Sequence, residues 1–186
     1  ILGFLGPNGA GKSTTMNILT GYISSTSGTA KVAGFDILEN PIEAKKHIGY
    51  LPEHPPLYLD MTVDEYLNFN YELKGCRLDK IAHLGEVCEV VRIGDVRKRV
   101  IKNLSKGYRQ RVGIAQALLG APEIVILDEP TANLDRETIE RLHDQIAYLK
   151  SRGHTILIAE HRLYFLADLI DRAVYLRDGI VERIWS

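Results

Sequence analysis

Short, continuous runs of apolar residues recur along the chain and give the first indication of its architecture. The clearest runs cover residues 1–5, 124–127 and 156–159. A run without polar residues at alternate positions is typical of a strand that is buried on both faces of a parallel sheet. The pattern therefore predicts central strands at these three places, although they are far apart in the sequence.

Helical patterns separate the apolar runs. Between the last two runs, four apolar residues repeat at the spacing of one helix face: Ile139, Leu142, Ile146 and Leu149. Asp135 or Arg136 is expected to begin this helix, and Gly153 to end it, because these residue types favour helix termini. Strands that alternate with helices indicate βαβ units, so the predicted fold class is α/β with a mostly parallel sheet.

The middle of the chain has a different pattern. Residues 62–119 carry helical periodicity, as in the spacing of Val63, Tyr66 and Leu67, and contain no convincing strand. We therefore expect one domain in which a helical subdomain is inserted into an α/β core. The predicted core covers residues 1–53 and 120–186, and the predicted helical subdomain covers residues 54–119.

Composition narrows the class of protein. The 186 residues are 45% hydrophobic and carry a net charge of −1, which favours a soluble globular domain over a protein that coats nucleic acid. Cys76 and Cys88 form no CxxC pair, so neither zinc nor a disulfide scaffold is expected. No secretory signal is visible. Because the chain opens on a strand-like run without Met, we expect a fragment of a longer, cytosolic protein.

A glycine-rich segment follows the first apolar run. It reads GPNGAGKS over residues 6–13 and fits the pattern GxxxxGK[ST] between a strand and a helix-like segment that ends at residues 20–21. In this pattern backbone N–H groups surround phosphate oxygens, the lysine reaches the β- and γ-phosphates, and the serine hydroxyl binds Mg²⁺. The predicted nucleotide-binding residues are Gly6, Pro7, Asn8, Gly9, Ala10, Gly11, Lys12, Ser13 and Thr14. The loop by itself fits a kinase, a GTPase or an ATPase.

Two carboxylates follow the apolar run at residues 124–127. Asp128 and Glu129 would lie at the carboxyl edge of a parallel sheet, where ligands bind in doubly wound folds. Asp128 is expected to hold Mg²⁺ directly or through water, and Glu129 to orient and polarise an attacking water.

The segment upstream of this strand makes the pattern specific. Residues 104–111 read LSKGYRQR and resemble the LSGGQ signature of ATP-binding cassette (ABC) ATPases. The signature residues would be Ser105, Lys106, Gly107 and Tyr108, with Lys106 and Tyr108 departing from the usual glycine and glutamine, as in exporter-type members. The resemblance implies a P-loop NTPase (RecA-like) core, with ATP and Mg²⁺ as cofactors. It also implies that the signature closes on the nucleotide of a partner subunit.

Other landmarks of the family follow in order. Residues 48–53 resemble the Q-loop segment, with Glu53 in place of glutamine and in reach of Mg²⁺ or water. Residues 131–135 resemble the D-loop, which ends at Asp135 and crosses to the other subunit. His161 follows the run at 156–159 and matches the histidine that senses the γ-phosphate. The other five histidines are expected on the surface: His47, His54, His83, His143 and His154.

The resemblance changes along the chain. Residues up to about 128 are most similar to exporter-type (ABC-2) ATPases, whereas the sequence AEHRLY at 159–164 is similar to ATPases of energy-coupling-factor systems. The family usually stacks adenine on an aromatic residue upstream of the phosphate loop, on an antiparallel subdomain. Only five residues precede Gly6 here, so this segment is expected to lack those strands and to bind the base weakly.

The function implied by the resemblance is that of the ATPase subunit of a membrane transporter. Two such subunits, in a homo- or heterodimer, would bury ATP head to tail. They would drive transmembrane permease subunits docked near residues 54–69, on the cytoplasmic face of the cell membrane. No nucleic-acid partner is expected. The main alternative is a soluble ABC ATPase that acts on ribosomes or DNA, and further alternatives are a P-loop kinase or GTPase and a regulatory nucleotide-binding module.

Overall fold

A mixed sheet at the centre of the described residues organises the molecule. The computed structural model describes residues 1–132, 134–161 and 163–186. In these residues a six-stranded sheet runs in the order β4-β5-β6-β1-β7-β8, and neighbouring strands are parallel except for the β7–β8 pair. Its strands are β1 (Leu2–Leu5), β4 (Ile48–Leu51), β5 (Ile124–Asp128), β6 (Thr155–Ala159), β7 (Arg172–Arg177) and β8 (Ile180–Trp185). The predicted α/β class is thereby confirmed, including the three strands expected from apolar runs.

The central strands are buried on both faces, which is why they read as continuous apolar runs. Along β5, Val125 and Leu127 belong to one hydrophobic cluster, and Ile126 between them belongs to the other. One cluster joins the sheet to the middle and late helices, whereas the other joins it to the first helices of the chain. Alternate side chains of a strand point to opposite faces, so each central strand contributes to both cores.

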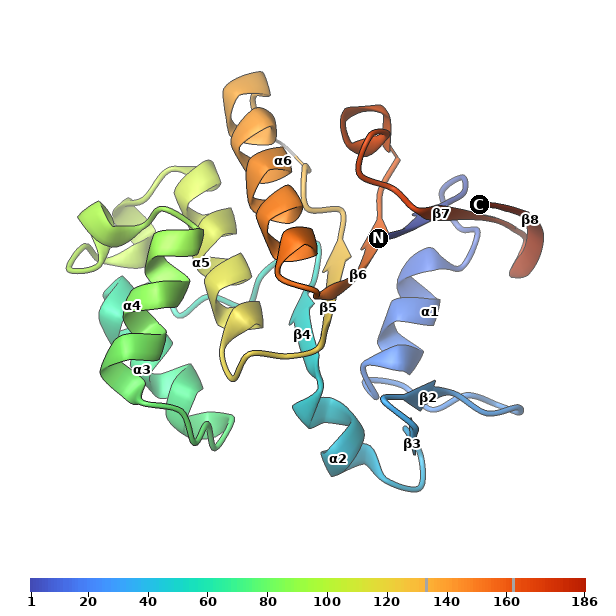
Figure 1. Ribbon diagram of the computed structural model, residues 1–186, viewed down its shortest axis with the longest axis horizontal. Coiled ribbons are helices and arrows are strands. Elements are labelled where there is room, and N and C mark those ends of the chain that lie inside the picture. Colours follow the sequence, from blue (N-terminus) through green and yellow to red (C-terminus); the bar gives the residue numbers. More distant parts are fainter. Residues whose placement is uncertain (133, 162) are drawn as a thin grey trace.

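Helices cover the two faces and one end of the sheet. The α-helices are α1 (Lys12–Leu19), α2 (Pro41–Lys46), α3 (Val63–Leu73), α4 (Lys80–Val90), α5 (Lys106–Leu118) and α6 (Arg136–Ser151). Short 3₁₀ segments are η1 (Gly94–Val96), η2 (Ile101–Asn103) and η3 (Leu163–Leu166), and β2 (Lys31–Val32) with β3 (Phe35–Asp36) forms a separate antiparallel pair. Figure 1 shows α3 and α4 at one end of the molecule and β7 and β8 at the other.

The helix predicted between the last two apolar runs is α6. Asp135 is its N-cap, and the Asp135 carboxylate accepts a hydrogen bond of 2.8 Å from the backbone N–H of Thr138. This bond satisfies one of the N–H groups that a helix start leaves without a partner. The helix ends at Ser151, and Gly153 beyond it has φ +87°. Both predicted termini are confirmed.

The segment 54–119 contains α3, α4, η1, η2 and α5, and its last helix lies directly on the sheet. A Cβ added to Gly49 of β4 would come within 2.2 Å of the carbonyl oxygen of Ala117, and one added to Gly113 of α5 would meet Leu51 at 2.7 Å. The backbones of β4 and α5 can approach this closely because glycine has no side chain. The signature helix is therefore packed on the strand that leads to Glu53.

One histidine of the helical segment differs from the sequence-based prediction. His83 was expected on the surface, but it is only 7% exposed, and its Nε2 accepts a hydrogen bond of 3.0 Å from the N–H of Gly120. This neutral acceptor role suits a buried imidazole, and burial lowers the pKa of His83.

Within the described residues, no helix is long and apolar enough to cross a bilayer.

Candidate active site

The sheet aligns the ends of three neighbouring strands. In the parallel register of β1, β6 and β5, Ala159 pairs with Phe4 on one side and with Asp128 on the other. The residues that follow these positions are the phosphate loop, the carboxylate Glu129 and the histidine segment. The carboxyl ends of parallel strands meet at one edge of a sheet, so these three segments, far apart in the sequence, are brought together.

The phosphate loop is shaped by glycine. Gly11, which precedes α1, has φ +100°, a conformation that L side chains rarely adopt. A Cβ on Gly6 would come within 2.4 Å of the carbonyl oxygen of Leu176 on β7. The loop therefore packs against β7 at its beginning, and it ends at the N-terminus of α1. A helix start of this kind is a favourable site for an anion.

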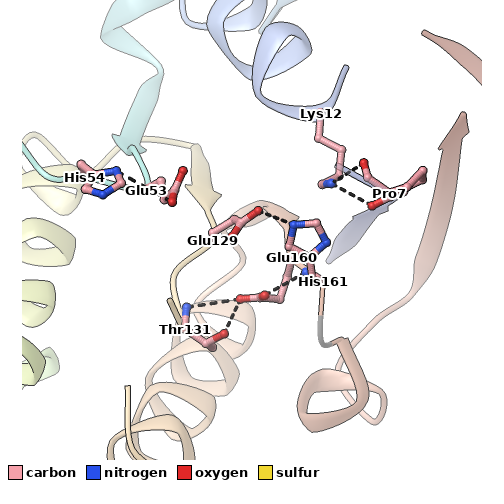
Figure 2. Close-up of polar contacts among 9 residues, drawn as sticks. Pro7, Lys12, Glu53, His54, Glu129, Thr131, Glu160 and His161 are labelled. Atoms are coloured by element: carbon pink, nitrogen blue, oxygen red, sulfur yellow. Dashed lines mark hydrogen bonds and ion pairs between the residues drawn. The ribbon is translucent and has the colours of Figure 1, made fainter. Parts of the chain in front are cut away.

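Lys12 lies in the first turn of α1 and is only 6% exposed. Its Nζ donates hydrogen bonds to the carbonyl oxygens of Gly6 at 2.8 Å and Pro7 at 3.2 Å (Figure 2). A buried ammonium group is stable only where acceptors surround it. The carbonyl oxygens of the loop thus hold the ammonium group of Lys12 against the loop itself.

Asp128 ends β5 and is 4% exposed. Burial raises the pKa of this carboxyl group, whereas a hydrogen bond with Ser13 opposes the shift. The Oδ1 atom of Asp128 is buried and has no hydrogen-bond partner among the described residues. A hard cation is a natural partner for such an oxygen.

The donors at this point fit Mg²⁺. Mg²⁺ commonly takes a hydroxyl and one carboxylate from the protein and fills its other positions with phosphate oxygens and water. Ser13 and Asp128 supply that pair. The described residues contain no group of three or more His, Cys, Asp or Glu side chains that could hold a metal without such help. The arrangement therefore fits a metal that binds together with a nucleotide.

Glu129 is held in an uncommon backbone conformation. Its φ is +47°, and its N–H donates a hydrogen bond of 2.8 Å to the carbonyl oxygen of Ala159. A positive φ at a residue other than glycine is strained, and such strain is concentrated at functional sites. The carboxylate contacts His161, with 2.7 Å between Oε1 and Nε2 (Figure 2). The structure thus brings the predicted base and the predicted histidine into direct contact.

Glu53 follows β4 at the same edge of the sheet. It is partly exposed and lies 3.8 Å from Nδ1 of His54. The charge of Glu53 contributes to the raised pKa of Asp128. The negative charges of Glu53 and Asp128 therefore repel each other, and a divalent cation bound near both carboxylates would reduce this repulsion. No described contact places Glu53 directly on Ser13 or Lys12.

The signature residues lie at the start of α5. Ser105 is the N-cap of this helix, and its Oγ accepts a hydrogen bond of 3.3 Å from the N–H of Tyr108. The Tyr108 hydroxyl donates to Asp95 at 2.7 Å, and the Arg111 guanidinium lies 4.0 Å from the centre of the Tyr108 ring. Within the described residues, no hydrogen bond or ion pair joins the signature to the phosphate loop of the same chain.

The D-loop region is described in part. Asn133 lies outside the described residues, as does Arg162 after the histidine. Thr131 is 7% exposed and hydrogen-bonded to Glu160, and Asp135 is the N-cap of α6. Asp135 thus has a local structural role, and its contact with a second subunit stays a prediction.

Sequence reasoning missed two polar side chains that hold this region in place. Gln110, in the second turn of α5, is buried, and its Nε2 donates a hydrogen bond of 3.0 Å to the carbonyl oxygen of Pro130. Glu160 is 3% exposed and contacts Thr131 and His161. A polar residue next to a predicted site residue, in an otherwise apolar stretch, was the only available signal for Glu160.

A strand, a glycine-rich loop and a helix that hold a buried lysine beside a strand-end carboxylate define a P-loop nucleotide-binding protein. The comparisons with known proteins narrow the class. The profile of the ABC transporter family matches residues 1–132, and the chain belongs to that family.

Named relatives agree with this assignment. The chain is 39% identical over 186 residues to the bacitracin transport ATP-binding protein BcrA of Bacillus licheniformis, covering 99% of this chain and 60% of that protein. It is 36% identical over 179 residues to the lantibiotic transport ATP-binding protein SrtF of Streptococcus pyogenes, covering 96% of this chain and 76% of that protein. The chain spans 60% and 58% of the lengths of the first two curated relatives.

Solved structures show the same fold. The chain superposes with a TM-score of 0.87, at 26% identity, on the ATP-binding cassette MJ0796 in a dimeric post-hydrolysis state bound to ADP and phosphate. The match covers 100% of this chain and 84% of that one. The sheet and helices described above are therefore those of an ATP-binding cassette.

Proposed function

We propose that this chain binds and hydrolyses ATP as the nucleotide-binding part of an ABC transporter. The observation that carries the proposal is the Glu129–His161 pair, which lies at the same sheet edge as the buried Lys12 and Asp128. A base, a phosphate-binding cation and a metal-binding carboxylate are the groups that hydrolysis of a nucleoside triphosphate needs.

The roles of the residues follow from their chemistry. Lys12 and the N–H groups of the phosphate loop bind the β- and γ-phosphates, and Ser13 and Asp128 hold Mg²⁺ with the nucleotide. Mg²⁺, when bound, neutralises negative charge on the phosphate oxygens. Glu129 accepts a proton from the attacking water and orients it. His161 holds Glu129 through the 2.7 Å contact between Nε2 and Oε1, and in this proposal it also contacts the γ-phosphate. We propose that the carboxylate of Glu53 contacts Mg²⁺ or a water molecule beside it.

The signature acts on a second subunit in this proposal. Ser105 and Gly107 lie at the N-terminus of α5, where the helix dipole and free N–H groups attract an anion. Among the described residues, the hydrogen bonds of Ser105 and Tyr108 lie within residues 54–119, Gly107 lies against Thr138 of α6, and none of these contacts reaches the phosphate loop of the same chain. A head-to-tail homo- or heterodimer would complete both sites. We also propose the division into a core of residues 1–53 and 120–186 and a helical subdomain of residues 54–119.

The composite site is tested by the mass of the full chain in solution. We expect the Glu129→Gln protein to double its mass by light scattering when Mg-ATP is added, because bound ATP is held by both subunits. The Glu129→Gln protein that also carries Lys12→Ala is the matched control and should stay monomeric. A Glu129→Gln protein that binds Mg-ATP and remains monomeric would contradict a homodimer, and wild-type hydrolysis by that monomer would favour a different P-loop enzyme.

A second surface is proposed for the membrane subunits. Tyr58, Leu59 and Phe69 are 52%, 45% and 40% exposed, and the rings of Tyr58 and Phe69 pack edge to face at 5.5 Å. Beside them is a cavity of about 560 Å³ lined by residues that include His54 and Pro56. Exposed apolar side chains next to a cavity are typical of an interaction site. Tyr66, from the same predicted segment, is 2% exposed and belongs to the core.

We expect Tyr58→Ala combined with Phe69→Ala to lower the fraction of the protein that sediments with membranes of its own cells, while ATP hydrolysis in solution is retained. Ile81→Ala is the control, because Ile81 is an apolar residue of α4 that is 86% exposed. Unchanged sedimentation of the double variant would remove this surface from the proposal. Tyr66→Ala is unsuitable as a test, because a cavity in the core costs ~3–5 kcal/mol of stability.

The membrane setting is the cytoplasmic face of the cell membrane in this proposal. It is supported by family membership and by the named transport relatives. The names of two relatives state what they transport, bacitracin and lantibiotics, so these are the first compounds to test for transport.

A further inference from the structure

A buried carboxylate lies directly behind the Glu129–His161 pair. Glu160 follows β6, is 3% exposed, and separates the end of that strand from His161. Burial of a carboxylate costs several kcal/mol unless hydrogen bonds compensate for the lost water. The hydrogen bonds that compensate for the burial of Glu160 therefore indicate what this side chain does in the fold.

Both oxygens of Glu160 are used, and they join two different segments. Oε2 accepts hydrogen bonds from the N–H of Thr131, at 3.2 Å, and from the Thr131 hydroxyl. Oε1 accepts a hydrogen bond of 2.8 Å from the backbone N–H of His161. Figure 2 shows Glu160 between these two residues, with the Glu129–His161 contact on the other side of His161.

The segment that carries Glu129 is thus fixed at both of its ends. The N–H of Glu129 donates to the carbonyl oxygen of Ala159, and Thr131, two residues further on, donates to Glu160. Between them, the carbonyl oxygen of Pro130 accepts from Gln110 of the signature helix. Because these three consecutive residues are each held by a hydrogen bond, the backbone of Glu129, the first of them, has little freedom, which is the condition for a positioned base.

We infer that Glu160 is a positioning residue for ATP hydrolysis, which holds the backbone of His161 and the Glu129 segment at a fixed separation. This inference rests on the ATPase activity proposed above. A carboxylate suits the role because both of its oxygens only accept hydrogen bonds, whereas a glutamine must present N–H groups to one of the two donors. Loss of that contact would let His161 and Glu129 move apart without touching the phosphate loop.

The test is steady-state ATP hydrolysis by the full chain carrying Glu160→Gln. We expect kcat to fall about a hundredfold, as for a small displacement of reacting groups, and KM and the affinity for ATP to change by less than about twofold. In a Glu129→Gln background, Glu160→Gln should lower the residual rate no further, because its effect acts through Glu129. A purely structural role would reduce the rate in both backgrounds and would also lower the melting temperature.

Thr131 provides an independent test if Glu160→Gln does not fold. Thr131→Val removes the hydroxyl and keeps the shape of the side chain, so kcat should fall about tenfold, the value of one hydrogen bond to a charged group. Thr131→Ser restores the hydroxyl and should restore most of kcat. Glu86→Gln, at an exposed carboxylate of α4, is the control and should match wild type.

The outcomes separate the two proposals. A wild-type protein that hydrolyses no ATP would refute the ATPase activity. An active wild type together with a folded Glu160→Gln protein of equal kcat would refute the role of Glu160 alone, as would equal activity of Thr131→Val and Thr131→Ser. A hundredfold loss that persists in the Glu129→Gln background would also refute it.

Discussion

Replacing Glu129 with glutamine is expected to lower ATP turnover by ~10²–10⁴-fold while ATP binding is retained. The amide keeps the size of the side chain and removes its ability to accept a proton. It also changes the group that lies 2.7 Å from Nε2 of His161 from a carboxylate oxygen to an amide. The measurement is phosphate release under saturating Mg-ATP, together with a titration of the variant with a fluorescent ATP analogue.

Two further proteins make this result interpretable. Glu137→Gln alters an exposed carboxylate in the first turn of α6 and should hydrolyse ATP at the wild-type rate. His161→Ala should lose turnover as Glu129→Gln does, and the double variant should be little worse than either, because residues that act as a unit are not additive. Comparable turnover in wild type and Glu129→Gln would remove Glu129 from the role of base.

Replacing Lys12 with alanine is expected to abolish measurable binding of ATP. Lys12 is the buried cation of the phosphate loop, and its ammonium group is the donor that would meet the β- and γ-phosphates. Each hydrogen bond between charged partners contributes about 1.5–3 kcal/mol, so loss of those to two phosphate groups weakens binding by about a hundredfold or more. Isothermal titration with ATP and Mg²⁺ gives the change directly.

Lys31→Ala is the matched control for this prediction, because Lys31 is an exposed lysine in β2. The melting temperature of Lys12→Ala should also be compared with wild type, since Lys12 donates to the carbonyl oxygens of Gly6 and Pro7. A folded Lys12→Ala protein that binds ATP with unchanged affinity would show that the loop is not the phosphate site.

Much of the fold could be predicted because its signals are local. The runs that became β1, β5 and β6 are apolar throughout since both faces of the sheet are covered. The α6 helix was predicted with both termini, because its cap and its apolar face are encoded within about twenty residues. β4 was not identified as a strand, since it has only four residues, Ile48–Leu51, and one of them is a glycine, which gives only a weak pattern.

The sequence predicted the identity of the candidate site residues better than the burial of side chains. Motif spacing was enough to name Lys12, Ser13, Asp128 and Glu129, because the chemistry of a phosphate loop restricts the residue types that can serve there. Burial was harder to predict. Tyr66 was assigned to an exposed docking surface and His83 to solvent, yet both side chains are buried against neighbours that lie elsewhere in the sequence.

The amino-acid sequence alone determined the three central strands, the α6 helix and the glycine-rich loop between β1 and α1, because each depends on neighbours within a few turns of chain. The contact of His161 with Glu129 and the bridge from Glu160 to Thr131 required the fold. They exist because β5 and β6 pair in a register that sets Asp128 beside Ala159. That register is fixed by packing on both faces of the sheet, which no local pattern encodes.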